Sequence, residues 1–261
     1  MNSILGAIGY YAYERSDMPA IEDGAGLSLD WATLARLLLQ IAKDVAERFD
    51  AHQPIAIRAD YGVARCLLEL VLLDLDLPVI AIPVFFNAEQ VGRTLEAAGC
   101  AVLVTEITLE RGASPRLRLA TETTPQRTVT LPPGTAIISF TSGSTDNPKG
   151  VCLSADHVAA VAATVVSYLG EEYAGRHLPL LPPGILLESV AGFYASMLAG
   201  GSYVALPQAA VGLANPFRPD FALMADAIDT HAITSLILVP EYLAGLVGAL
   251  EASGRRLPRL T

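Results

Sequence analysis

One short segment of this chain gathers several side chains that could bind an oxyanion. Residues 139–151 read Ser-Phe-Thr-Ser-Gly-Ser-Thr-Asp-Asn-Pro-Lys-Gly-Val and include five hydroxyl side chains, two glycines and a lysine. Hydroxyls and flexible backbone amides donate hydrogen bonds to phosphate oxygens, and a lysine adds positive charge. An apolar, strand-like run (135–140) leads in and a second apolar run (151–153) leads out. The segment therefore predicts a phosphate-binding loop between two strands.

Two common phosphate-binding templates do not fit residues 139–151. A Walker loop has four residues between its first glycine and a Gly-Lys-Ser/Thr sequence, and a dinucleotide-binding turn has Gly-x-Gly-x-x-Gly. Neither spacing occurs in this segment. If residues 139–151 bind phosphate, they must therefore do so with a different type of loop. The secondary structure around the loop helps to identify that type.

Helical and strand patterns alternate along the chain on both sides of the loop. Helices are predicted at residues 31–49, 63–75, 88–98, 155–169, 187–199, 221–230 and 241–252, and strands at 54–59, 78–83, 101–105, 135–140, 177–181, 202–206 and 235–239. Asp30, Asn87 and Ser154 are suited to cap the helices that follow them, and Gly99 can close the helix before it. This rhythm predicts an α/β fold with mainly parallel sheets flanked by helices.

The polar segment 106–133 interrupts this alternation. It is rich in threonine and arginine and contains two stretches of alternating character, 116–120 and 127–131. Such a pattern predicts a small hairpin, inserted into the domain or added to a sheet edge.

The composition excludes several classes of function. The chain has 261 residues, of which 52% are apolar and 17% charged, so it can bury a large core. Its formal net charge of -10 argues against a nucleic-acid-binding surface, which needs a basic face. Prolines and acidic residues interrupt the longest apolar stretches, 66–86 and 178–206, so no membrane span is expected. Three scattered cysteines and the lack of a secretory signal predict a cytoplasmic protein.

Residues 141–151 resemble the signature loop of the adenylate-forming (AMP-binding) ligase superfamily. That superfamily contains acyl- and aryl-CoA synthetases, non-ribosomal peptide adenylation domains and luciferases, and its pattern is Thr-Ser-Gly-Ser/Thr-Thr-x-x-Pro-Lys-Gly-Val. Every fixed position of the pattern is matched in this sequence. The resemblance continues through the opening segments 17–23 and 27–34, the early strands at 54–57 and 79–84, and the core segments at 178–180, 191–193 and 199–202.

The resemblance covers only the N-terminal region of such an enzyme. The later family motifs are a Tyr-Gly-x-Thr-Glu segment, a ribose-binding aspartate, a hinge and a C-terminal lysine, and none occurs in this sequence. Residues 1–261 are therefore expected to be the truncated N-terminal portion of an adenylation domain, with the small hairpin around 106–133 and without the C-terminal lid domain. Such a chain is expected to be inactive by itself, with its catalytic residues beyond Thr261.

The resemblance implies ATP-dependent activation of a carboxylic acid, with pyrophosphate release and later thioester formation. The implied cofactors are ATP and Mg²⁺, and the implied acceptor is coenzyme A or the pantetheine of an acyl carrier protein. In that role, hydroxyl groups of the loop donate to the β- and γ-phosphates, glycines allow close backbone approach, and the lysine neutralises the leaving group. The residues so assigned are Thr141, Ser142, Gly143, Ser144, Thr145, Lys149 and Gly150.

The acid-binding pocket is less clearly marked than the phosphate loop. Ile185, Glu188 and Gly192 are its candidate residues, because residues 185–188 are similar to a variant found in fatty-acid enzymes. Glu188 could line the pocket, or it could cap or pair at the start of its helix. A histidine common after the signature loop is replaced by Ala155. The class of acid, whether aryl, fatty or amino, therefore stays open.

The four histidines show no catalytic pattern, since His52, His177 and His231 have no clustered partners in the sequence and His157 fits a helix surface or core position. Two other classes of function remain. A non-catalytic module of the same fold would bind an acyl or aryl ligand or a partner protein. A different phosphotransferase is disfavoured, because no Walker or kinase pattern occurs.

Overall fold

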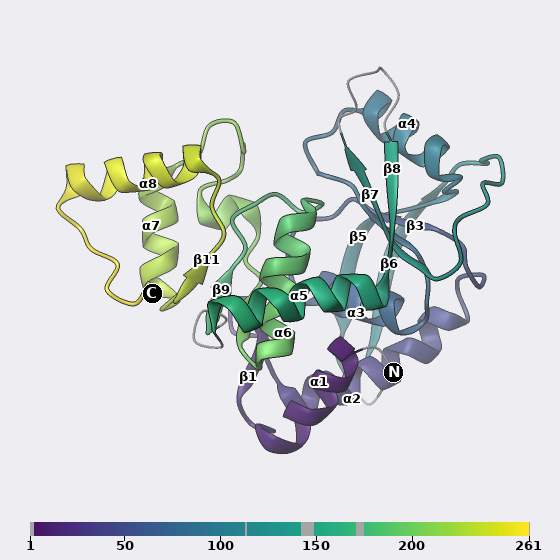
Figure 1. Ribbon diagram of the computed structural model, residues 1–261, viewed down its shortest axis with the longest axis horizontal. Coiled ribbons are helices and arrows are strands. Elements are labelled where there is room, and N and C mark those ends of the chain that lie inside the picture. Colours follow the sequence, from purple (N-terminus) through teal and green to yellow (C-terminus); the bar gives the residue numbers. More distant parts are fainter. Residues whose placement is uncertain (1–2, 113, 142–148, 171–174, 261) are drawn as a thin grey trace.

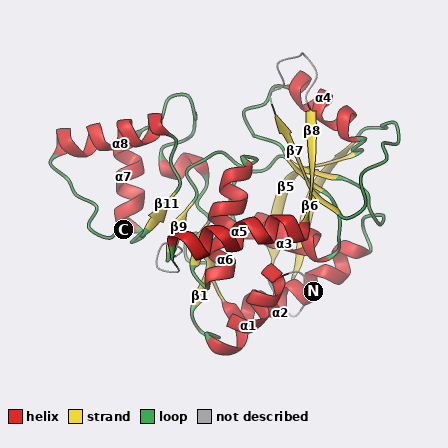
Figure 2. Ribbon diagram, viewed as in Figure 1, coloured by secondary structure: helices red, strands yellow, loops and turns green. Residues whose placement is uncertain are grey.

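A computed structural model describes residues 3–112, 114–141, 149–170 and 175–260, and shows an α/β protein built on two sheets (Figures 1 and 2). The six-stranded sheet has the strand order β6-β5-β3-β4-β7-β8. In chain order, its strands are β3 (Ile55–Ile57), β4 (Val79–Ala81), β5 (Val102–Glu110), β6 (Arg116–Thr123), β7 (Thr135–Thr141) and β8 (Lys149–Ser154). The five-stranded sheet has the strand order β11-β9-β10-β1-β2. In chain order, its strands are β1 (Pro19–Glu22), β2 (Ser28–Asp30), β9 (Arg176–Leu178), β10 (Ser202–Val204) and β11 (Ser235–Leu236).

Helices cover both sheets. They are α1 (Ser3–Glu14), α2 (Trp31–Ala46), α3 (Val63–Asp74), α4 (Ala88–Ala98), α5 (Ala155–Leu169), the π-helix η2 (Glu188–Tyr194), α6 (Ala195–Ala199), the 3₁₀ helix η3 (Gln208–Val211), α7 (Phe221–Thr230) and α8 (Pro240–Ser253). The six-stranded sheet and α4 form one side of the molecule in Figure 1, and α7 and α8 form the other.

The sheets are mainly parallel, as the alternating pattern predicts. In the six-stranded sheet, β5, β3, β4 and β7 pair in parallel, and the edge strands β6 and β8 pair antiparallel to their neighbours. In the other sheet, β11, β9, β10 and β1 pair in parallel, and only the edge strand β2 is antiparallel. Because parallel strands end at the same edge of a sheet, the loops that follow them gather there.

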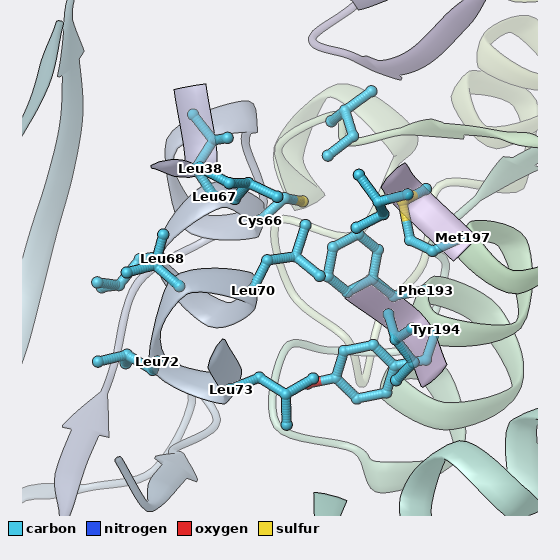
Figure 3. Close-up of a cluster of buried hydrophobic side chains, with 14 of the residues drawn as sticks. Leu38, Cys66, Leu67, Leu68, Leu70, Leu72, Leu73, Phe193, Tyr194 and Met197 are labelled. Carbon is cyan, nitrogen blue, oxygen red and sulfur yellow. The ribbon is translucent and has the colours of Figure 1, made fainter. Parts of the chain in front are cut away.

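Helix α3 is buried on all sides between the two sheets. It contacts β4 and β5 of the first sheet and β1 of the second. Its Leu70 and Leu73 point toward Phe193 and Tyr194 of η2, and Leu68 and Leu72 point to the opposite side, as Figure 3 shows. A helix that is apolar around its whole circumference is stable only in such an interior position. The opposite face of the first sheet is covered by α4, whose Val91 and Leu95 pack over β3, β4 and β5.

The helix boundaries follow the sequence signals closely. The Asp30, Asn87 and Ser154 side chains accept the predicted capping hydrogen bonds, and Gly99 ends α4 in the left-handed conformation. Helix α1 was not among the predicted elements, although Ile4, Ile8 and Tyr11 are buried at helical spacing. The predicted helix 187–199 is correct in position, but its first half is a π-helix.

The polar segment forms one hairpin, and part of the prediction for it is wrong. β5 and β6 pair antiparallel from Val102–Thr123 to Glu110–Arg116, which makes β6 the sheet edge. Residues 127–131 are not a strand. Pairing ends where the Thr124 N–H donates to the Ala101 carbonyl, and prolines at 125, 132 and 133 lack the N–H groups that a continued ladder would need.

Cys66 and Cys100 are buried, and Cys152 is only partly buried. Burial raises the pKa of Cys66 and raises the pKa of Cys100 to about 11. Among the described helices, none combines the length and the apolar character that crossing a membrane requires.

A buried ion pair interrupts the apolar surface of α3. The Arg65 Nη2 lies 2.7 Å from the Glu69 Oε1, one helical turn away, and the Arg65 Nη1 donates to the Ala59 carbonyl at 2.6 Å. Both residues are buried. Burial lowers the pKa of the Arg65 guanidinium, but Glu69, Tyr61 and Cys66 together raise it by more, so the pKa lies above its ordinary value. The pair ties the start of α3 to the segment that leaves β3.

We expect Glu69→Ala to lower the free energy of unfolding by about 3–5 kcal/mol, because it leaves the Arg65 charge buried without a partner. The matched control is Glu89→Ala, which removes an exposed pair with Arg93 on α4 and should cost less than about 1 kcal/mol. Urea denaturation followed by circular dichroism measures both. Equal losses in the two variants would contradict the role assigned to the buried pair.

Candidate functional site

Strands β7 and β8 hold the two ends of the predicted phosphate loop. Thr141, the last residue of β7, pairs directly with Lys149, the first residue of β8. The intervening residues 142–148 lie outside the described part of the chain, so the roles predicted for Ser142, Gly143, Ser144 and Thr145 stay predictions. The Lys149 side chain is exposed and, within the described residues, makes no ion pair.

Gly150 has a local reason to be glycine. A Cβ at this position would lie 3.1 Å from two atoms of the Phe140 ring and 3.2 Å from an Ile138 methyl group. These distances are tighter than ordinary van der Waals contact, so the Phe140 ring would have to shift. The need for a glycine at position 150 therefore has two alternative explanations. One is close packing between β7 and β8, and the other is close approach of a phosphate to the backbone.

The loop starts at the same sheet edge as the segment that follows β4. β4 and β7 are parallel neighbours, with Val79 opposite Ile137. The chain therefore leaves both strands in the same direction. The segment after β4 is fixed by Arg58, which follows β3 and donates from Nη2 to the carbonyls of Val84 (3.1 Å) and Phe86 (2.9 Å).

An apolar groove lies where the strands of both sheets end. Its volume is about 520 Å³. Its described lining residues are Phe85, Leu181, Pro182, Ile185, Leu187, Pro216, Phe217, Pro219, Phe221, Val239, Glu241 and Tyr242. Phe85 follows β4 of the six-stranded sheet, whereas Leu181, Phe217 and Val239 follow β9, β10 and β11 of the other sheet. In open α/β sheets, ligands bind beyond the carboxyl ends of the strands.

Aromatic rings form much of the groove. Phe85 and Phe217 meet edge to face, with ring centroids 5.5 Å apart, and Phe221 and Tyr242 meet at 6.4 Å. The Tyr242 hydroxyl donates to the Pro216 carbonyl at 2.7 Å, so its polar end is satisfied within the protein. Phe217 is 77% exposed, so much of its ring is open to solvent.

Glu188 lies in a buried hydrogen-bonded network beside the groove. The Glu188 Oε1 is 2.8 Å from the His177 Nε2, and the His177 Nδ1 is 3.1 Å from the Ser235 Oγ. The Glu188 Oε2 accepts a long hydrogen bond, 3.4 Å, from the Leu181 N–H. The network joins η2, β9 and β11, so it ties one helix to two strands. Of the two interpretations open for Glu188, pairing at the helix start is what the structure describes.

The backbone of Leu181 is held at both of its polar groups. Its N–H donates to Glu188, and its carbonyl accepts from the Tyr61 hydroxyl at 3.0 Å. Burial raises the pKa of Tyr61 well above its ordinary value, and the Glu188 charge raises it further, so the hydroxyl remains a donor. The Tyr203 ring stacks on His177 with centroids 5.7 Å apart. These contacts fix the groove wall that Leu181 forms.

The structure therefore separates the residues proposed for the acid pocket. Ile185 lines the groove, whereas Glu188 and Gly192 are buried beside it and are not among its described lining residues. His177 has no clustered partner in the sequence, but the fold brings Glu188 and Ser235 to its ring, so its role is structural. His157 lies on the exposed surface of α5.

Sequence reasoning missed the aromatic residues of the groove. Phe217 stands between Pro216 and Arg218-Pro219 in the loop after β10, and an aromatic residue next to prolines in a polar loop is a usable signal. Tyr61 gave no signal, because its partner Leu181 is distant in sequence. For metal ions, the described residues contain no group of three or more His, Cys, Asp or Glu side chains that could hold one.

We expect Gly192→Ala to destabilise the protein by about 1–3 kcal/mol, because overpacking forces buried groups apart. A Cβ there would lie 2.1 Å from the Glu188 Oε1 and 2.8 Å from the His177 Nε2. The control is Gly248→Ala on exposed α8, where a Cβ meets nothing within 4 Å and the change should stabilise by about 0.5–1 kcal/mol. Thermal unfolding distinguishes the two. A Gly192 variant as stable as the wild type would show that the network tolerates a methyl group.

Comparisons with known proteins agree with this architecture. A family model described as "AMP-binding enzyme" matches residues 10–260. Among curated proteins, phenyloxazoline synthase MbtB of Mycobacterium tuberculosis is 33% identical over 129 residues. The match covers 49% of this chain and 8% of that protein, so the chain spans only a small part of the relative.

Three solved structures share the fold at low sequence identity. The long-chain-fatty-acid-CoA ligase FadD1 of Archaeoglobus fulgidus has a TM-score of 0.74 at 16% identity, covering 99% of this chain and 56% of that chain. The non-ribosomal peptide synthetase FmoA3, bound to α-methyl-L-serine-AMP, has a TM-score of 0.72 at 23% identity, and the match covers 98% of this chain and 29% of that chain. The N-terminal subdomain of Klebsiella oxytoca NpsA, in complex with 3-hydroxybenzoyl-AMSN, has a TM-score of 0.68 at 20% identity, and the match covers 91% of this chain and 60% of that chain.

The family match extends over nearly the whole sequence, and the fold is that of the N-terminal part of adenylate-forming enzymes. The chain thus belongs to the AMP-binding enzyme family.

Proposed function

We propose that this chain is the N-terminal portion of an enzyme that activates a carboxylic acid with ATP. The reaction forms an acyl- or aryl-adenylate and releases pyrophosphate. The observation that best supports this proposal is the complete signature sequence at residues 141–151, which begins where β7 ends and returns as β8. Its first residue, Thr141, lies at the same sheet edge as the end of β4, and the segment after β4 contributes Phe85 to the apolar groove.

In the proposed reaction, a carboxylate oxygen attacks the α-phosphorus of ATP. A new bond forms between that oxygen and the α-phosphorus, and the bond to the oxygen bridging the α- and β-phosphorus breaks. Pyrophosphate leaves with the electron pair. The barrier is mainly repulsion between negative groups, so positioned donors and a cation supply most of the acceleration.

The signature loop supplies those donors and that cation. The hydroxyls of Thr141, Ser142, Ser144 and Thr145 would donate to the β- and γ-phosphates, Gly143 and Gly150 would admit the phosphates close to the backbone, and Lys149 would neutralise the leaving group. An exposed Lys149 without an ion pair among the described residues is available for this role. Mg²⁺ held mainly by phosphate oxygens would further reduce the charge repulsion when bound.

The groove is the proposed site for the acid. Ile185 contributes to its lining, and Glu188 and Gly192 support the adjacent wall. The adenylate would then pass to a thiol, of coenzyme A or of a carrier-protein pantetheine. The relatives support both acceptors, because they include a CoA ligase and a non-ribosomal peptide synthetase.

We expect Lys149→Ala to slow acid-dependent pyrophosphate exchange by about 10²-fold or more, because one charged contact to the leaving group is lost. The assay uses the longest natural protein that contains this chain. Lys43→Ala is the matched control, since Lys43 is the other lysine of the sequence and lies exposed near the end of α2. Exchange at the wild-type rate in the Lys149 variant would contradict the assignment and would favour a non-catalytic ligand-binding module.

The 261 residues alone are expected to give no detectable pyrophosphate exchange with any acid. The reason is that the sequence lacks the Tyr-Gly-x-Thr-Glu segment and the distal lysine expected to complete the site. The measurement compares the isolated chain with the longer protein at equal concentration. Robust turnover by the isolated chain would show that its own residues are sufficient for catalysis.

A further inference from the structure

The apolar groove offers a ligand very few charged groups. Of its described lining residues, eleven of the twelve are uncharged and Glu241 is the exception. Glu241 lies in the first turn of α8 and is exposed to solvent. The volume of about 520 Å³ falls within the range of small-molecule pockets, about 300–1,000 Å³. Such a site stabilises an apolar tail and offers little to a buried cation.

Among the described residues, the buried carboxylate next to the groove is that of Glu188, and it is already engaged. Glu188 is 1% exposed, its Oε1 is bonded to the His177 Nε2, and its Oε2 accepts the Leu181 N–H. Gly192 packs so closely against Oε1 that even a methyl group would not fit between them. A substrate ammonium group could therefore not reach this carboxylate without breaking the network.

An amino acid would consequently bring an unpaired charge into the groove. Its ammonium group would lose water and find no described carboxylate in the groove interior, which is unfavourable. An acid with the same tail but without the amine loses no such hydration. The arrangement of Glu188 thus favours one class of acid over the other.

Resting on the proposed function, we infer that the groove binds the tail of an apolar carboxylic acid that has no ammonium group beside its carboxyl. Arylalkanoic acids and medium-chain fatty acids meet this description. Glu188 acts in this selectivity as a positioning residue, because it holds the Leu181 wall and is withheld from the ligand.

The test measures binding of matched acid pairs to the purified chain by calorimetry, with and without ATP. The pairs are 3-phenylpropanoate with phenylalanine, and octanoate with 2-aminooctanoate. In each pair we expect the amine-free acid to bind at least about tenfold more tightly. An amino acid that binds as tightly as its partner, or failure of all four acids to bind, would overturn the inference.

A groove variant adds a readout that a general loss of structure would not give. Leu187 lines the groove and is 52% exposed. Leu187→Asp should therefore weaken binding of the amine-free acid and reduce the ratio of its affinity to that of the amino acid. The control is Leu39→Asp, at an exposed leucine of α2 outside the groove, which should leave both affinities unchanged. An unchanged ratio in a folded Leu187 variant would contradict the assignment of the groove.

The proposed acid activation and the proposed selectivity of the groove can be contradicted independently of each other. Selective acid binding without pyrophosphate exchange in the longer protein would remove the proposed catalysis and leave the groove assignment intact. Pyrophosphate exchange with amino acids in preference to amine-free acids would keep the catalysis and overturn the inference.

Discussion

The direction of the strands is the constraint on which the rest of this structure depends. β4 and β7 run parallel as neighbours, so the signature segment and the Phe85 segment leave the six-stranded sheet at one edge. In the second sheet, β9, β10 and β11 are also parallel, and the loops after them supply the other groove residues. The signature segment and the apolar groove are thereby brought to the ends of strands, where ligands of α/β proteins bind.

Two buried polar arrangements stabilise this geometry. The Arg65–Glu69 pair connects the start of α3 to the backbone leaving β3, and α3 separates the two sheets. The Glu188–His177–Ser235 network connects η2 to the second sheet and fixes Leu181. Both place charge in an apolar interior, where an unsatisfied group is costly. Their geometry is therefore specific, and Glu188 contacts the groove wall directly through the backbone N–H of Leu181.

Local signals made much of the fold predictable from sequence. The capping residues Asp30, Asn87 and Ser154 mark three helix starts, and the alternating elements indicate parallel sheets. The signature segment was recognisable because its pattern is contiguous. The groove was not, because Phe85, Leu181, Phe217 and Val239 come from four separate loops that only the fold brings together. The partners of Glu188 were hidden for the same reason, since Ser235 lies far along the chain.

The central claim is that the signature segment and the groove belong to one acid-activating site. The most direct measurement is a crystal structure of the longer protein with a non-hydrolysable ATP analogue and an amine-free aryl acid. We expect the terminal phosphates to lie against Lys149 and the acid tail to lie between Phe85 and Phe217. Phosphates bound away from Lys149, or an acid bound outside the groove, would contradict the central claim.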